Sequence, residues 1–190
     1  TLTLTNYPIT GPVFSGPHET PFYCETASFR FPDGTQPLGA PLDANCSIAT
    51  RVDHFYRTTG NAWKRLDPPY NHPADLATTT TNEGKTVPFI TRIETGTVDR
   101  AIYQTSMLHD PKNEADPGLF RRSTAWNGRL VFTFGGGCTN GWYRQGASTG
   151  GVTDPVILGR GYAIASSSLN VFGNNCNELL TSEALMMTKE

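Results

Sequence analysis

The sequence of 190 residues is short of charge and has no long hydrophobic run. Asp, Glu, Lys and Arg make up 17% of it, less than the roughly 25% of an average soluble domain. Acidic and basic residues nearly balance, with a formal net charge of -2, so the chain lacks the basic surface that holds nucleic acid or an anionic membrane. No stretch reaches the roughly 18 apolar residues of a transmembrane helix. We therefore expect neither nucleic acid nor a membrane as a partner.

Cysteine is scarce as well, with Cys24, Cys46, Cys138 and Cys176. None of them forms a CxxC pair, and no histidine lies within three residues of any of them. Zinc sites are normally built from such closely spaced Cys and His ligands. We expect no metal site, and no motif in the sequence calls for a cofactor.

Four cysteines allow three disulfide pairings. Proximity in the sequence favours Cys24–Cys46 and Cys138–Cys176, and each loop would contribute roughly 3–4 kcal/mol by chain entropy. Free thiols are the alternative. An even number of cysteines in a turn-rich chain with few charges points to an oxidising compartment. The sequence therefore predicts a secreted or periplasmic protein.

The chain divides into two parts that differ in amino-acid composition and in the regularity of their strand and helix patterns. Residues 1–84 are rich in Pro, Gly, Asn and Thr, and such segments form turns and extended stretches that lie over other structure. Only "ATRVDHFYRTTG" in this part reads as a short strand. Regular patterns begin at residue 85. We expect residues 1–84 to pack as an irregular, β-containing segment on a sheet formed by residues 85–190.

Strand and helix patterns alternate in the second part. A hairpin turning around Gly96 is predicted first, and then the strand "RLVFTF" after a tight turn at Asn127–Gly128. A short helix should begin at Asp154 and Pro155. The strand "YAIAS" and the helix "NELLTSEALMMTKE" follow. Strands that alternate with helices are typical of a mainly parallel α/β sheet, in which ligands bind at the carboxyl ends of the strands.

Three glycines, Gly135–Gly137, follow the strand "LVFTF" directly. A phosphate loop would need GxxxxGK[ST] or GxGxxG opening into a helix, and neither is present. A sharp turn remains possible. The third interpretation is an oxyanion hole, in which backbone N–H groups converge on one point. Its donors would be the amides of Gly136 and Gly137, together with that of Cys138.

Other polar residues should lie at the same edge of the sheet. Ser166–Ser168 and Asn170 follow the strand "YAIAS", and a Cys138–Cys176 bridge would join the two loops. Trp142 and Tyr143 could line a substrate pocket with Asn170, although aromatic packing explains them equally well. The histidines are interpreted as loop or surface residues rather than as a catalytic base; they are His18, His54, His72 and His109.

Three stretches carry a wider resemblance: "PADLATTTTNEGKTVPFITRIETGTVDRAIYQTSMLHDP", "WNGRLVFTFGGGC" and "RGYAIASSSLNVFGNNCNELLTSEALMMTKE". They resemble a poorly characterised family of secreted α/β-hydrolase-like proteins that are distantly similar to tannase-like and hydroxybutyrate-oligomer esterases. The resemblance implies the front part of an α/β-hydrolase fold. It also implies that the nucleophilic serine lies on a later strand turn. Ser148 and Ser166–Ser168 are not interpreted as the nucleophile, because we expect them to lack the flanking glycines of a nucleophile elbow.

The sequence thus predicts the N-terminal portion of a secreted serine-esterase-like hydrolase. This portion would supply the oxyanion hole for a small or polymeric ester and would need the C-terminal part of the same hydrolase to be active. The alternative is a non-catalytic secreted binding or scaffold module, in which the glycines only turn the chain.

Overall fold

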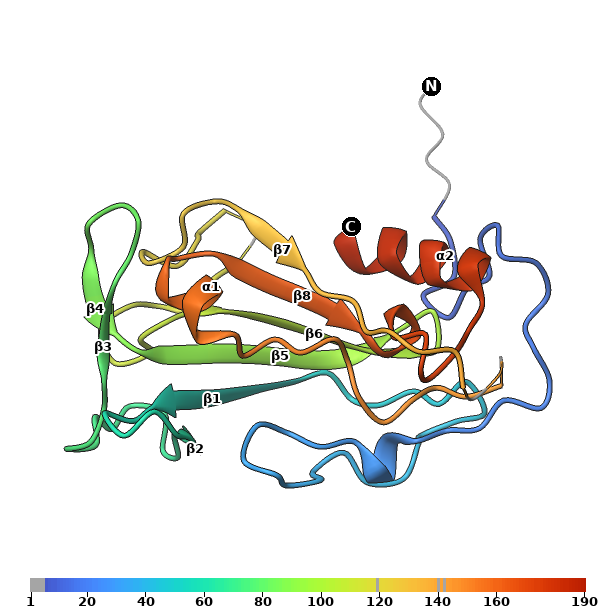
Figure 1. Cartoon of the computed structure of the whole chain (residues 1–190), viewed down its shortest axis with the longest axis horizontal. Coiled ribbons are helices and arrows are strands. Elements are labelled where there is room, and N and C mark those ends of the chain that lie inside the picture. Colours follow the sequence, from blue (N-terminus) through green and yellow to red (C-terminus); the bar gives the residue numbers. More distant parts are fainter. Residues whose placement is uncertain (1–5, 119, 140, 142) are drawn as a thin grey trace.

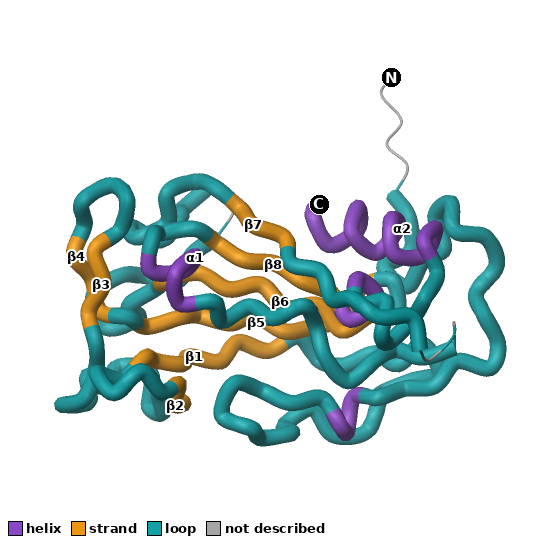
Figure 2. The backbone as a smooth tube through the Cα atoms, in the orientation of Figure 1, coloured by secondary structure: helices purple, strands orange, loops and turns teal. Residues whose placement is uncertain are grey.

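The computed structural model describes residues 6–118, 120–139, 141 and 143–190. Long loops connect a six-stranded sheet, a separate pair of strands and two α-helices (Figures 1 and 2). The sheet has the order β2-β1-β5-β6-β8-β7. Its strands are β1 (Arg51–Arg57), β2 (Trp63–Arg65), β5 (Ile90–Val98), β6 (Ala101–Leu108), β7 (Leu130–Phe132) and β8 (Ala163–Ser167), while β3 (Thr78–Thr80) pairs with β4 (Thr86–Pro88).

Strands β5 and β6 form the predicted hairpin, but its turn is not at Gly96. The strands continue to the pair Val98 and Ala101, and the two residues between them, Asp99 and Arg100, have φ of 51° and 60°. Positive φ at both central positions is the geometry of a tight hairpin turn. Gly96 lies inside β5, opposite Tyr103, where a Cβ would come within 2.7 Å of the tyrosine ring, so the position favours glycine for packing rather than for a turn.

The sheet is mixed and mostly antiparallel, which corrects the prediction of a mainly parallel sheet. Parallel pairing joins β7 to β8, whereas β2, β1, β5, β6 and β8 are antiparallel neighbours. The reason lies in the connections. Antiparallel strands can be joined by a two-residue turn, while parallel strands need a crossover. In the described chain, such a crossover through a helix connects β7 to β8.

Helix α1 (Pro155–Gly159) and helix α2 (Glu178–Lys189) begin where the sequence predicts. The Asp154 carboxylate accepts hydrogen bonds from the amides of Val156 and Ile157, and Asn177 caps the amides of Leu179 and Leu180 in the same way. Side-chain oxygens at this position satisfy amides that the first helical turn leaves unpaired. Both caps therefore explain why these helices start at those residues.

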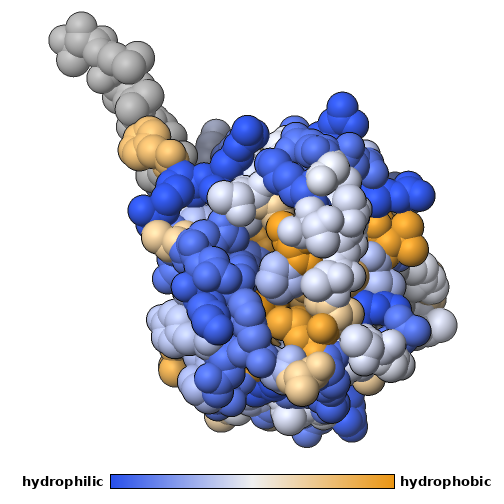
Figure 3. Space-filling view, turned by 90° about the vertical axis from the view of Figure 1, so that its left-hand side faces the viewer, coloured by the Kyte–Doolittle hydropathy of each residue, from blue (hydrophilic) through white to orange (hydrophobic). Residues whose placement is uncertain are grey.

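The main core lies on the face of the sheet that α1 covers. It contains eleven buried residues: Phe29, Phe31, Phe55, Phe89, Ile93, Ile102, Leu108, Ala125, Val152, Leu158 and Ile164. A second, smaller core lies under α2, where Leu180 and Ala184 pack on Ala101 and Leu169. Seen from the β3–β4 end, the surface is largely hydrophilic with a narrow band of apolar side chains (Figure 3).

The turn-rich first part contributes to the same sheet as the second. Strands β1 and β2 extend the sheet beyond β5, and the β3–β4 pair spans the boundary at residue 84. The 3-10 helix η1 (Thr26–Ser28) lies in the loops before β1. Buried Gln145 fixes these loops: its side chain donates to the carbonyls of Cys46 and Arg100 and accepts from the amide of Glu25.

Candidate functional site

The carboxyl ends of β7 and β8 lie side by side, and the loops that leave them stay paired. We call residues Gly135–Cys138 the glycine loop. The amide of Gly135 donates to the carbonyl of Asn170 at 3.0 Å, and Gly173 donates to the carbonyl of Gly136 at 3.0 Å. The 3-10 helix η2 (Ser168–Asn170) continues from β8 into this pairing. The glycines therefore lie beside the end of the "YAIAS" strand, as the sequence predicts.

The three glycines have three different surroundings. A Cβ at Gly135 would lie 2.6 Å from Cγ1 of Val171, and Gly137 has a φ of 95° that disfavours other residues. Around Gly136, by contrast, no described atom beyond the adjacent residues lies within 4 Å of the position that a Cβ would take. Packing and backbone conformation thus account for Gly135 and Gly137, but not for Gly136.

The amides after Gly135 are available to a ligand. Residues Gly136, Gly137 and Cys138 are exposed. Their N–H groups donate no hydrogen bond to any described residue, unlike the paired amide of Gly135. Two or three unpaired N–H groups in succession can stabilise a negative oxygen if they point to the same place.

Two disulfides are present, Cys24–Cys46 and Cys138–Cys176, and they are the pairs that sequence proximity favours. The second one joins the glycine loop to the segment before α2. Next to it, the amide of Cys176 donates to the carbonyl of Gly141 at 2.9 Å. The bridge therefore limits the movement of the unpaired amides relative to the end of β8.

The serines at the end of β8 are buried and serve the fold. Ser166 Oγ donates to the carbonyl of Thr133 at 2.9 Å and accepts from the amide of Gly150 at 2.8 Å. Ser167 Oγ accepts from the amide of Leu169, and Ser168 Oγ accepts from the amide of Ile102. In the described chain none of these hydroxyls is bonded to a histidine, which is the partner that activates a nucleophilic serine.

The expectation that Ser148 lacks the flanking glycines of an elbow is wrong. Residues 146–150 read GASTG and match the G-x-S-x-G spacing, with Ser148 at the centre. A nucleophile elbow places its serine on a sharp turn between a strand and a helix. Ser148 instead lies in an exposed loop that precedes α1 by several residues, and its carbonyl accepts from the side chain of Asn174 at 2.8 Å. The spacing of the motif was visible, but its strand–turn–helix context is not there.

The other residues predicted for the site do not lie together in one pocket. Asn170 is 1% exposed, and its side-chain amide donates to the carbonyl of Thr181 in α2. Tyr143 is exposed and lines a pocket of about 500 Å³ with Tyr23, Cys24, Glu25, Ser28 and Arg144. Arg144 forms an ion pair with Glu25 in this pocket. Trp142 lies outside the described residues.

Three of the four histidines take part in two close side-chain contacts that do not involve the glycine loop. His54 Nε2 lies 3.3 Å from Nδ1 of buried His109, and His72 Nε2 lies 3.0 Å from the carboxylate of Asp110. Burial, together with the neighbouring imidazole of His109, lowers the pKa of His54 to about 4. His54 is consequently neutral at physiological pH, although no serine is bonded to it in the described chain.

Neither a metal cluster nor a membrane segment is found in the part of the chain that the structure describes. No group of three or more His, Cys, Asp or Glu side chains is arranged to hold a metal ion there. No described helix is long and apolar enough to cross a membrane.

Comparison with known proteins gives one relationship. No curated protein and no solved structure is significantly similar to the chain. The model of a tannase-like family of unknown function (DUF6351), however, matches residues 1–190. The match covers all 190 residues, and the protein therefore belongs to this tannase-like family.

Proposed function

We propose that this chain supplies the oxyanion hole of a secreted esterase-type hydrolase. The donors would be the amides of Gly136 and Gly137, with Cys138 as a third. The observation that carries the proposal is that these residues, directly beyond β7, are exposed and that their amides have no partner among the described residues. The membership of a tannase-like family favours ester hydrolysis over the binding or scaffold module.

The proposed nucleophile is a serine on another segment of the same hydrolase. Strand β7 lies at the edge of the sheet, and Leu130 and Phe134 beside that edge are 47% and 54% exposed. An open apolar edge is a template for a further strand. A strand running parallel to β7 would end about 5 Å from it, next to the glycine loop. A serine on the turn after that strand would then face the free amides.

The proposed compartment is extracellular or periplasmic. Both disulfides favour an environment in which thiols are oxidised. The substrate would be a small or polymeric carboxylic ester, and catalysis by the chain would need neither a metal nor a cofactor. In this mechanism the serine oxygen adds to the ester carbonyl carbon while a base on another segment of the hydrolase takes the hydroxyl proton. The carbonyl π bond opens to a negative oxygen, which the glycine amides stabilise in the tetrahedral intermediate.

The oxyanion role is tested with two substitutions at one position, in the hydrolase that carries this chain. Gly136→Pro removes the N–H donor, whereas Gly136→Ala keeps it and adds a Cβ where no described atom beyond the adjacent residues lies within 4 Å. Gly136→Pro should lower kcat for a chromogenic ester by about 100-fold to 1000-fold. Gly136→Ala should retain most of the activity. Equal kcat values for the wild type and the Gly136→Pro variant would refute the role of this amide.

The position of the nucleophile is tested separately by labelling with a fluorophosphonate and mapping the modified peptide. We expect a labelled serine outside residues 1–190. A label on Ser148 would instead assign the nucleophile to the GASTG loop and contradict the proposed edge strand. Absence of any labelled serine in an active enzyme would contradict serine catalysis altogether.

A further inference from the structure

A groove of about 670 Å³ runs over the face of β5 and β6 opposite the main core. Its floor is formed by strand residues whose side chains alternate with buried ones, and its wall is the loop between β6 and β7. It shares no residue with the glycine loop. The lining residues are Arg92, Glu94, Thr105, Met107, Pro117, Gly118, Phe120, Arg121, Arg122 and Trp126.

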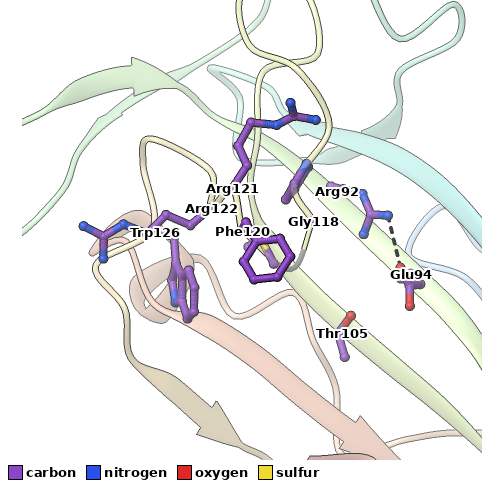
Figure 4. Close-up of a pocket in the computed structure, with 10 residues that line it drawn as sticks. Arg92, Glu94, Thr105, Gly118, Phe120, Arg121, Arg122 and Trp126 are labelled. Carbon is purple, nitrogen blue, oxygen red and sulfur yellow. Dashed lines mark hydrogen bonds and ion pairs between the residues drawn. The ribbon is translucent and has the colours of Figure 1, made fainter. Parts of the chain in front are cut away.

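Two aromatic rings stand at this groove. Phe120 is 102% exposed and lies at the tip of a reverse turn closed by mutual backbone bonds of Gly118 and Arg121 at 2.8 and 3.0 Å. The Trp126 ring is held by a bond from Nε1 to the carbonyl of Arg129 at 2.9 Å. Figure 4 shows the Phe120 ring over the groove with the Trp126 ring beside it. Covering an exposed aromatic ring with a flat apolar ligand surface removes it from water, which favours binding.

The loop that carries these rings is anchored at its base. Buried Ser123 donates from Oγ to the carbonyl of Leu108, and the Glu114 carboxylate accepts from the amide of Thr124 at 2.8 Å and from the amide of Asp110 at 3.1 Å. These bonds hold the wall of the groove in place without a ligand. Glu114 lines a separate pocket with Leu108 and Thr124 and is not part of the groove lining.

The groove has a positive lining. The lining contains three arginines and one carboxylate, so its net charge is +2. These residues are Arg92, Arg121, Arg122 and Glu94. Glu94 is bonded to Arg92 at 3.1 Å, and the Nε of Arg92 is buried without a partner in the described chain. The Arg122 side chain forms no hydrogen bond or close ion pair with a described residue, although, after the hydrogen bond from Lys85, its charge helps to lower the pKa of Glu83, and its guanidinium extends outward from the loop (Figure 4). Free guanidinium groups pair preferentially with carboxylates or other oxyanions.

We propose that this groove binds an acidic oligosaccharide through its carboxylates and its sugar rings. The ring C–H faces would stack on Phe120 and Trp126, and the guanidinium of Arg122 would pair with a carboxylate. Arg121 donates from Nε and Nη2 to the carbonyl of Asp116 at 2.9 and 2.6 Å, and so would contribute its positive charge to the wall from a fixed position. The open form of the groove favours a chain over a small aromatic acid, because small ligands are bound in pockets that enclose most of their surface. Here Phe120, Arg121 and Arg122 all stay exposed.

Calorimetry with trigalacturonate tests the proposal, with fully methyl-esterified trigalacturonate and benzoate as matched probes. We expect trigalacturonate to bind, its neutral ester to bind at least tenfold more weakly, and high salt to weaken the binding of the acid because exposed charges are screened. Failure of trigalacturonate to bind would overturn the proposal. Equal affinity for the neutral ester, or tighter binding of benzoate, would overturn it too.

Substitutions test whether trigalacturonate binds in the groove. Phe120→Ala and Arg122→Gln should each weaken trigalacturonate binding by roughly tenfold. Phe134→Ala and Arg129→Gln are the controls, because these side chains are also exposed but do not line the groove. Circular dichroism verifies that all four variants are folded. If the controls weaken binding as much as Phe120→Ala and Arg122→Gln, the saccharide binds elsewhere and the assignment is wrong.

Discussion

Val171 packs directly against Gly135 across the bridge that extends the parallel pair of β7 and β8. A Cβ at Gly135 would lie 2.6 Å from Cγ1 and 2.9 Å from Cγ2 of Val171. Gly135 also donates its amide to the carbonyl of Asn170. The first glycine of the triplet is thus a packing position, while the second has free space and a free amide.

Substitution should therefore separate these two adjacent glycines. Gly135→Ala overpacks the contact with Val171, and overpacking typically lowers the free energy of unfolding by about 1–3 kcal/mol. Gly136→Ala should change it by less than about 0.5 kcal/mol, which is usual for an exposed position. Urea unfolding of both variants measures the difference. Equal midpoints for the two variants would show that the space around Gly135 can relax.

Removal of the disulfide beside the glycine loop should affect both stability and catalysis. The double variant Cys138→Ser, Cys176→Ser opens a link between residues 38 apart, and such a link contributes about 4 kcal/mol by chain entropy. Ester turnover should fall as well, because the amides lose their tether to the end of β8. Cys24→Ser with Cys46→Ser is the control, which should lower the urea midpoint but largely retain turnover. Loss of turnover in the control alone would contradict the tether.

Local signals in the sequence predict several elements correctly. Asp154 and Pro155 begin α1 and the polar cap Asn177 begins α2, because a cap is set by neighbouring residues. The two disulfide pairs also follow from short separations. The sheet topology does not follow from local signals. Strand β6 is antiparallel to β8, and such pairing depends on contacts between distant parts of the chain that no local pattern encodes.

The same limit applies to the sites. Three successive glycines draw attention to the loop, but only the packing of Val171 distinguishes Gly135 from Gly136. The groove was not predicted, because Phe120 reads as an ordinary apolar residue until its full exposure is seen. The GASTG spacing around Ser148 was readable and was overlooked; only the surrounding loop argues against an elbow.

The buried carboxyl group of Asp99 makes stability depend on pH. Burial and the nearby Glu183 carboxylate raise the pKa of Asp99 to about 8, and Arg100 offsets this only in part. The folded state therefore binds a proton that the unfolded state releases near its ordinary pKa of 3.8. The resulting stabilisation is full below that value and is lost as pH rises through about 8.

Asp99→Asn should remove this dependence. Asparagine tolerates the left-handed conformation of Asp99, which has a φ of 51°. The wild type should lose on the order of a few kcal/mol between about pH 6.5 and 9, and the variant should lose much less. Urea midpoints measured across this range check the prediction. Parallel curves for the two proteins would show that Asp99 does not hold the proton.

His54 has the opposite effect, at lower pH. Its pKa falls from 6.5 to about 4 in the folded state, so the unfolded state binds more protons between these values and stability rises with pH across this interval. In the wild type this rise opposes the fall due to Asp99. In the Asp99→Asn background, the rise from about pH 4 to 6.5 should become visible in the urea midpoint. His54→Gln in that background should flatten it. An NMR titration that finds the folded-state pKa of His54 near 6.5 would refute this account, because no differential proton binding would then remain.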